Sequence, residues 1–160
     1  MGMEPERAAI EFVDEPAYDG GLPLLSDLEA TELLRRARRI AVVGASTLPW
    51  RPSHSVLGYL LAHGYECVPV NPNHHEVLGR VSYPSLEAAV EATGPFDIVD
   101  VFRRPEYTPD IARSAVNTGC RALWLQQGVI SAEAVQIAHD GGLDVVMDRC
   151  TAVVHGHIRE

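Results

Sequence analysis

A phosphate-binding turn is the chemistry that the sequence suggests most directly, at Gly44-Ala45-Ser46. These small residues follow a short apolar run at 40–43 and precede, after a polar loop that contains proline, a segment with helical spacing at 53–63. Backbone N–H groups exposed at such a turn and the dipole of the following helix both attract anions. We therefore predict that a nucleotide-type ligand lies over Gly44-Ala45-Ser46.

One other interpretation of this turn stays open, and two more are not favoured. The dinucleotide fingerprint has three glycines, G-x-G-x-x-G, and only Gly44 matches it, so Gly44 could simply let the chain turn away from the strand. A serine hydrolase is not favoured, because Gly-Ala-Ser46 lacks the Gly-x-Ser-x-Gly pattern, and Ser46 is better suited to donate a hydrogen bond to phosphate. An NAD site is not favoured either, because Val70 ends the next strand and is followed by Asn71 and Pro72 instead of an acid.

The histidines and cysteines do not predict a metal centre. Cys150, His155 and His157 are the closest grouping among seven histidines and three cysteines, and a fourth ligand for a tetrahedral site is not identified. Cys67 and Cys120 are far from Cys150 in sequence, so no disulfide framework is expected.

The elements that must position these residues alternate between strands and helices, which indicates the α/β class. We predict a Rossmann-like, doubly wound and mostly parallel sheet with helices on both faces, in a single domain. The predicted strands cover 40–43, 66–70, 97–102, 122–125 and 143–147, with a short strand at 81–83 after a loop at 73–79. One predicted helix begins at a capping box at Ser26–Glu29. Further helices are predicted at 53–63, 86–92, about 105–117 and 131–138, and we expect the helix at 131–138 to be the last.

In such a sheet, ligands bind beyond the carboxyl ends of the strands, at the switch in strand order. We therefore expect five groups to meet at one edge, at 44–46, 71–72, 102–104, 126–128 and 148–150.

Length and composition limit the class of protein. The 160 residues suit one domain, which we divide into an acidic extension at 1–21, the folded domain at 22–150 and a tail at 151–160. A net charge of −9 argues against nucleic acid as a general partner. All 13 basic residues are arginine, which excludes Schiff-base chemistry and a P-loop lysine. Without a signal peptide or an apolar run long enough for a membrane span, we expect a cytoplasmic protein.

Taken together, these stretches resemble the small stand-alone CoA-binding proteins with a Rossmann-type fold, and also the N-terminal domain of the succinyl-CoA synthetase α subunit. The matching stretches lie at 42–46 with Arg51 and Ser53, and at 64–65, 68–72, 97–102, 123–128 and 147–150.

The resemblance implies a coenzyme A or acyl-CoA ligand. Gly44, Ala45 and Ser46 would approach the pyrophosphate, with Arg51 as a phosphate partner. The adenosine would be bordered by Val70 and Pro72, beside Asn71. The groove for the pantetheine arm would be lined by Val101, Phe102 and Arg103 and closed by Gln126 or Gln127. Arg104 is more simply explained as an exposed loop charge.

The resemblance does not extend to ligase activity, because 160 residues leave no room for the second domain with its phosphorylated histidine. We therefore expect a non-catalytic carrier, sensor or regulatory partner for CoA. An NAD(P)-linked oxidoreductase and a ligase subunit that acts with another chain remain alternatives, and a homodimer is open. Cys150, next to Arg149, also raises the hypothesis of a mixed disulfide with CoA, against the simpler role of a small buried residue.

Overall fold

A computed structural model describes residues 20–158 of the chain. At its centre is a parallel sheet of five strands in the order β2-β1-β5-β6-β7. The strands are β1 (Arg39–Val43), β2 (Glu66–Val70), β5 (Ile98–Val101), β6 (Ala122–Leu125) and β7 (Asp144–Val146). The predicted doubly wound α/β fold is confirmed. The acidic extension predicted at 1–21 lies outside the described residues, apart from Gly20 and Gly21.

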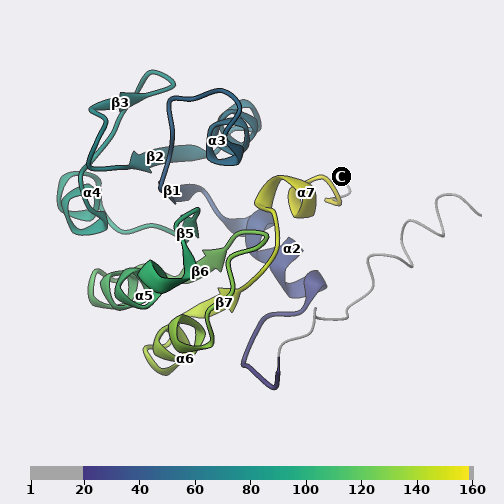
Figure 1. Cartoon of the computed structure of the whole chain (residues 1–160). Coiled ribbons are helices and arrows are strands. Elements are labelled where there is room, and N and C mark those ends of the chain that lie inside the picture. The colour runs from purple at the N-terminus through teal and green to yellow at the C-terminus, as the bar shows by residue number, and fades with distance from the viewer. Residues whose placement is uncertain (1–19, 159–160) are drawn as a thin grey trace, which may run out of the picture.

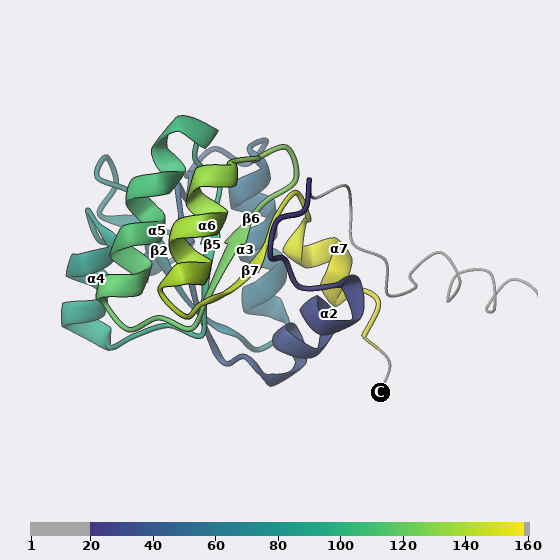
Figure 2. The ribbon, with the colours of Figure 1, turned by 90° about the horizontal axis from the view of Figure 1, so that it is seen from below.

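Helices cover both faces of the sheet (Figure 1). One face carries α4 (Leu86–Thr93), α5 (Thr108–Asn117) and α6 (Ala132–Asp140). The other face carries α2 (Asp27–Arg36), α3 (Pro52–Ala62) and α7 (Thr151–His155), and α7 lies beside α2 (Figure 2). The predicted capping box is present at the start of α2, where Ser26 and Glu29 bond to each other's backbone N–H groups.

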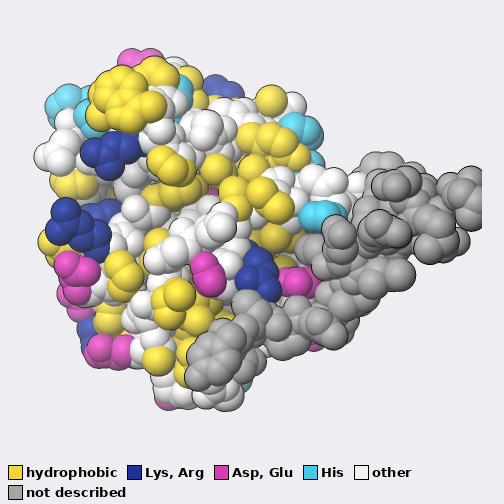
Figure 3. All heavy atoms as spheres, turned by 45° about the vertical axis from the view of Figure 1, so that its right-hand side comes forward, with side chains coloured by type: hydrophobic (Ala, Val, Ile, Leu, Met, Phe, Trp, Pro, Cys, Tyr) yellow, Lys and Arg dark blue, Asp and Glu magenta, His cyan; other side chains and the backbone are white. Residues whose placement is uncertain are grey.

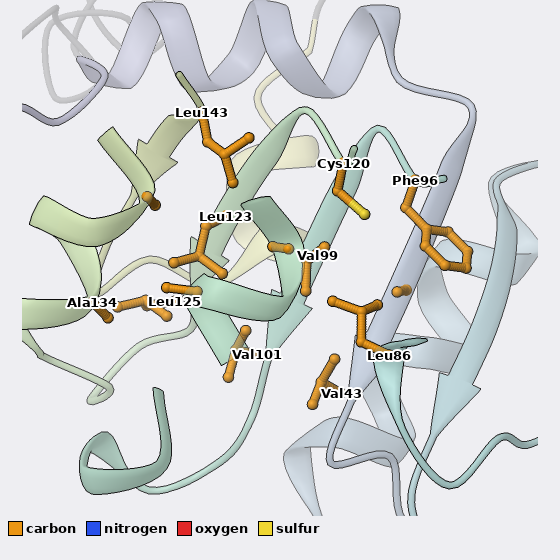
Figure 4. Close-up of a cluster of buried hydrophobic side chains, with 14 of the residues drawn as sticks. Val43, Leu86, Phe96, Val99, Val101, Cys120, Leu123, Leu125, Ala134 and Leu143 are labelled. Atoms are coloured by element: carbon orange, nitrogen blue, oxygen red, sulfur yellow. The ribbon is translucent and has the colours of Figure 1, made fainter. Parts of the chain in front are cut away.

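Strand residues alternate between two cores, as the two-residue period of a strand requires. Val99 and Val101 of β5 point toward α4, α5 and α6, and Figure 4 shows both among the buried side chains of that cluster. Ile98 points to the opposite face, toward α2, α3 and α7. Residues of every strand of the sheet are buried in both cores, which explains why the strands are mostly apolar in the sequence.

The order of the strands places a topological switch between β1 and β5. From β1 the chain passes through α3 to β2 at one edge of the sheet, and it returns through α4 to β5 on the other side of β1. The segments that leave the carboxyl ends of the paired strands β1 and β5 lead to helices on opposite faces of the sheet, and a crevice forms where these segments diverge.

Three predicted elements differ from the structure. The predicted loop at 73–79 contains a short strand, β3 (Glu76–Val77). It pairs with β4 (Arg80–Val81), which begins one residue before the short strand predicted at 81–83. The predicted helix at 105–117 begins with a separate 3₁₀ turn, η1 (Pro105–Tyr107).

The prediction that the helix at 131–138 is the last one is wrong, because α7 follows it. Five residues are too few to show a helical period in the sequence. Helix α7 is held instead by tertiary contacts, since Val154 is buried against the α2 and α3 core and Thr151 is fully buried.

Gly141, just after α6, is a sensitive point in the packing of α5 against α6. A Cβ atom at this position would lie 2.5 Å and 2.6 Å from the two methyl carbons of Val116. We expect Gly141→Ala to lower the free energy of unfolding by about 1–3 kcal/mol, because valine is stiff and cannot move aside. Chemical denaturation would measure the loss, and the Gly141→Ala/Val116→Ala double variant should lose less than the sum of the two single variants. Additive losses would contradict the steric cause.

Candidate functional site

Two neighbouring cavities lie over the carboxyl ends of the strands, at the topological switch. The smaller, of about 360 Å³, extends toward Gln126, Gln127 and Cys150, and the larger, of about 590 Å³, extends toward the end of β2. The two cavities share four of their lining residues, Gly44, Ser46, Arg51 and Phe102. They therefore form one elongated depression, which we call the switch-point crevice.

Gly44 holds the crevice open where β1 and β5 approach each other. Its φ of 91° is a conformation that favours glycine, and its N–H donates to the carbonyl of Val70 at 2.9 Å. A Cβ atom here would lie 3.1 Å from Cδ of Arg103 and 3.3 Å from the carbonyl carbon of Phe102. The turn thus needs glycine for both its conformation and its lack of a side chain.

Asn71 ties the β1 turn to the end of β2. Its side-chain Nδ2 donates to the carbonyl of Ala45 at 2.7 Å, and its Oδ1 accepts from the N–H of Asn73 at 2.8 Å. Ala45 as a whole is fully buried and lines neither cavity, unlike Gly44 and Ser46 on either side of it. Ser46 accepts from the N–H of Leu48 at 3.0 Å, which leaves its hydroxyl proton available as a donor.

The start of helix α3 faces the crevice. Arg51 is the N-cap residue and makes no side-chain capping bond, Pro52 has no N–H, and the first turn contains no acidic residue. Ser53 is buried and lines the smaller cavity. An eleven-residue helix with an uncapped start presents a partial positive charge to whatever lies in the crevice.

The lining of the crevice is cationic. Arg51, Arg103 and Arg104 all line the larger cavity, and the guanidinium of Arg103 lies 4.4 Å above the centre of the Tyr107 ring. Among residues 20–158, no aspartate or glutamate lines either cavity, although the chain has a net charge of −9. Figure 3 shows arginine side chains among hydrophobic groups on part of the molecular surface. The crevice is therefore suited to an anionic ligand with an apolar portion.

Below the smaller cavity is a polar network that the sequence analysis missed. Nε2 of Gln126 donates to Oδ1 of Asp100 at 2.5 Å and to Oγ1 of Thr151 at 2.8 Å, and Thr151 donates to Oδ2 of Asp100 at 3.0 Å. Burial raises the pKa of Asp100 to about 7, although the bonds from Gln126 and Thr151 oppose that rise. An aspartate inside the apolar run at 97–102 was the signal that could have revealed this network.

The other predicted site residues occupy different environments. Val70 and Val101 have their side chains in the core, Pro72 lines the larger cavity, and Gln127 is exposed at the rim of the smaller one. Gln126 lines the smaller cavity, but its amide is committed to the buried network. Cys150 lines the smaller cavity and is half-buried, whereas the other two cysteines are buried.

The described part of the chain holds neither a metal-binding cluster nor a membrane-spanning helix. Residues 20–158 contain no group of three or more histidine, cysteine, aspartate or glutamate side chains arranged to hold a metal ion. Within the same range, no helix has the length and apolar character needed to cross a lipid bilayer. The predicted cytoplasmic location stays a prediction.

Comparison with known proteins places the chain among small domains of similar size. Residues 38–156 match the family described as CoA binding domain. The Bacillus subtilis (strain 168) protein YneT is 44% identical over 130 residues, which make up 81% of this chain and 94% of YneT.

Solved structures show the same fold. A protein from Pyrococcus horikoshii OT3 has a TM-score of 0.79 at 36% identity, with 90% of this chain and 97% of that protein covered. A protein from Thermus thermophilus has a TM-score of 0.75 at 36% identity, with 81% of this chain and 96% of that protein covered. The dinucleotide-forming acetyl-coenzyme A synthetase 1 of Ca. Korarchaeum cryptofilum, at 24% identity and a TM-score of 0.61, shares the fold, and 71% of this chain covers 26% of that enzyme.

Proposed function

The chain belongs to the CoA binding domain family, as the sequence resemblance predicted, and we propose that it binds coenzyme A or an acyl-CoA in the switch-point crevice without catalysing a reaction of its own. The main support for this proposal is the set of residues that line the crevice. Three arginines and the start of α3 converge there, and among the described residues no carboxylate lines the cavities. Coenzyme A carries a pyrophosphate and a 3′-phosphate, which guanidinium groups and helix-terminal N–H groups bind well.

The two cavities suit the two ends of this ligand. The backbone at Gly44 and Ser46, with Arg51, lines both cavities and suits the central pyrophosphate. The larger cavity, bordered by Pro72 and the remaining arginines, suits the phosphorylated adenosine. The smaller cavity is lined by Val56, Val129 and Cys150, which suits the pantetheine arm and its terminal thiol or acyl group.

We expect Arg51→Ala to weaken acetyl-CoA binding at least tenfold, because a hydrogen bond to a charged group contributes about 1.5–3 kcal/mol. Calorimetric titration of ligand-stripped protein with CoA and acetyl-CoA would measure the loss of affinity. Parallel titrations with NAD and NADP would test the alternative ligands. Arg113→Ala is a suitable control, since Arg113 lies on α5 and pairs with Asp110 and Glu133.

Saturable binding to NAD or NADP alone would contradict the proposal and favour the oxidoreductase alternative. Equal acetyl-CoA affinities in the Arg51→Ala variant and the wild type would place the ligand elsewhere on the protein. Co-purification with a catalytic chain that uses the bound CoA would favour the ligase-subunit alternative over the non-catalytic one.

Cys150 offers a second readout of the same proposal, because it lines the crevice while Cys67 and Cys120 are buried. Bound acetyl-CoA, which has no free thiol to consume the reagent, should slow alkylation of Cys150 by iodoacetamide. Mass spectrometry of the modified peptide would measure the rate. Unchanged alkylation at saturating acetyl-CoA would place the pantetheine arm outside the smaller cavity.

A further inference from the structure

A separate cavity, of about 410 Å³, lies where the carboxyl ends of α2, α3 and α7 meet. Helix α2 leads directly into the start of β1, so this cavity is at the amino edge of the sheet, opposite the switch-point crevice. Its polar lining consists of Arg35, Arg38, Tyr59, His63, Tyr65 and His155. We call it the basal cavity.

The basal cavity gathers basic side chains. Two guanidinium groups and two imidazole rings line it, and within the part of the chain that the structure describes no aspartate or glutamate does so. Arg35 reaches Glu32 at 3.5 Å along the exposed side of α2, where water screens the pair. In a chain with a net charge of −9, two guanidinium groups placed together beside two imidazole rings, without an acid in the lining, indicate an anion site.

Capping of the helix ends explains only part of this cluster. Cations are favoured at carboxyl ends of helices, where unpaired carbonyls carry partial negative charge. Here the carbonyls of Leu60 and Leu61 accept backbone N–H groups of residues 63–65, and the carbonyl of Leu34 accepts the hydroxyl of Tyr65 at 2.5 Å. Arg38 donates to the carbonyl of Ala37 at 3.4 Å, a long bond that does not account for its position.

The aromatic wall of the cavity is already ordered. The rings of Tyr59 and His63 are stacked with centroids 4.0 Å apart, and the ring of His155 meets both edge-on. The hydroxyl of Tyr59 and Nδ1 of His155 are 2.8 Å apart. Nδ1 of His63 lies 2.8 Å from the carbonyl of Tyr59, which can only accept, so Nδ1 carries a proton, and Nε2 donates to a phosphate oxygen only when the ring is an imidazolium.

We propose that the basal cavity binds a phosphate group, either inorganic phosphate or the phosphate of a small monoester. Guanidinium forks and imidazole groups on a rigid aromatic wall match the charge and the acceptors of phosphate. This site is separate from the switch-point crevice and does not depend on the proposed CoA binding.

A ¹H–¹⁵N NMR titration of the full chain with sodium phosphate, at constant ionic strength, tests this site residue by residue. Amide signals of residues 35–38, 63–65 and 155–156 should shift with saturation, at a dissociation constant of about 1 mM or tighter. A parallel titration with glycerol 3-phosphate would show whether a free phosphate or a monoester binds better. Phosphate in the crevice would instead move signals of residues 44–53, so the two sites are distinguished.

Arg38→Gln and His63→Gln should each weaken the phosphate response at the basal cavity at least tenfold, and both side chains are exposed, so the fold should survive. Arg121→Gln is the control, because Arg121 is exposed and does not line the cavity. Shifts that grow linearly without saturation, or that are the same in an Arg35→Gln/Arg38→Gln double variant as in the wild type, would overturn the proposal.

Discussion

Gly44→Ala is expected to lower the free energy of unfolding by about 2–4 kcal/mol and to weaken acetyl-CoA binding at least tenfold. Part of the loss comes from the backbone, since a side chain at a φ of 91° is strained. The rest comes from overlap with Arg103 and with the backbone of Phe102, at 3.1 Å and 3.3 Å from the added Cβ. Relief of that overlap must push apart the ends of β1 and β5, which form the crevice.

Gly64→Ala is the matched control for this variant. Gly64 has the same φ of 91°, and a Cβ added there meets no atom within 4 Å. It should therefore show the backbone strain alone, about 1–2 kcal/mol, with unchanged acetyl-CoA affinity. Denaturant unfolding and calorimetric titration of both variants would separate the two causes. Equal stability losses at the two positions, with normal binding by Gly44→Ala, would show that the close approach at the crevice does not matter.

The sequence predicts the central elements of this fold because each carries a strong local signal. The runs at 66–70 and 122–125 are apolar, rich in residues that favour strands, and bounded by glycine, proline or polar residues, and both strands have those bounds in the structure. Ser85 and Ser131 lie at the starts of the helices predicted at 86–92 and 131–138, and the side chain of each accepts a backbone N–H three residues later. Local patterns therefore locate most of the strands and helices around the site.

The sequence does not predict how these elements are ordered in space or what lies below the crevice. The switch between β1 and β5 follows from strand order, which no local pattern encodes. Gln126 or Gln127 was predicted to close the groove, and no local pattern indicated that the amide of Gln126 bonds to Asp100 and Thr151, which are 26 and 25 residues away in sequence. Contacts of that kind depend on the register of β5 and β6 and on the position of α7.

The same limit applies to Val101. Its place at the end of a predicted strand suggested a groove residue, and only the pairing of β5 with its neighbours shows that its side chain points into the core (Figure 4).

Asp100→Ala is the second variant expected to have a large effect, a loss of about 3 kcal/mol in the free energy of unfolding. Asp100 is fully buried, and its two carboxyl oxygens accept bonds from Gln126 on the β6 side and from Thr151 of α7. Alanine would leave these donors without their acceptor in a buried position, which costs about 1–3 kcal/mol for each group. Denaturant unfolding would measure the loss, and an effect below about 0.5 kcal/mol would contradict a structural role for the network.

Stability should also depend on pH through Asp100, and the sign follows from the direction of its pKa shift. Burial raises the pKa from 3.8 to about 7, so between these values the folded protein holds a proton that the unfolded chain has lost. The contribution of Asp100 to the free energy of unfolding is therefore greatest below pH 3.8, falls as the pH rises toward about 7, and is constant above that. The steepest slope is about 1.4 kcal/mol per pH unit.

Asp100→Asn isolates this effect, because asparagine keeps an acceptor for Gln126 and does not titrate. Unfolding of both proteins at several pH values between about 5 and about 8 should show the variant gaining stability relative to the wild type as the pH rises, with the difference levelling near pH 7. Asp144→Asn, at the exposed start of β7, controls for loss of a carboxylate in general. A difference that stays constant with pH would mean that Asp100 is ionised in the folded protein. Because the bond from Thr151 opposes the rise in the pKa of Asp100, it favours the ionised carboxylate, so this one contact with α7 weakens in acid even though the protein as a whole is more stable there.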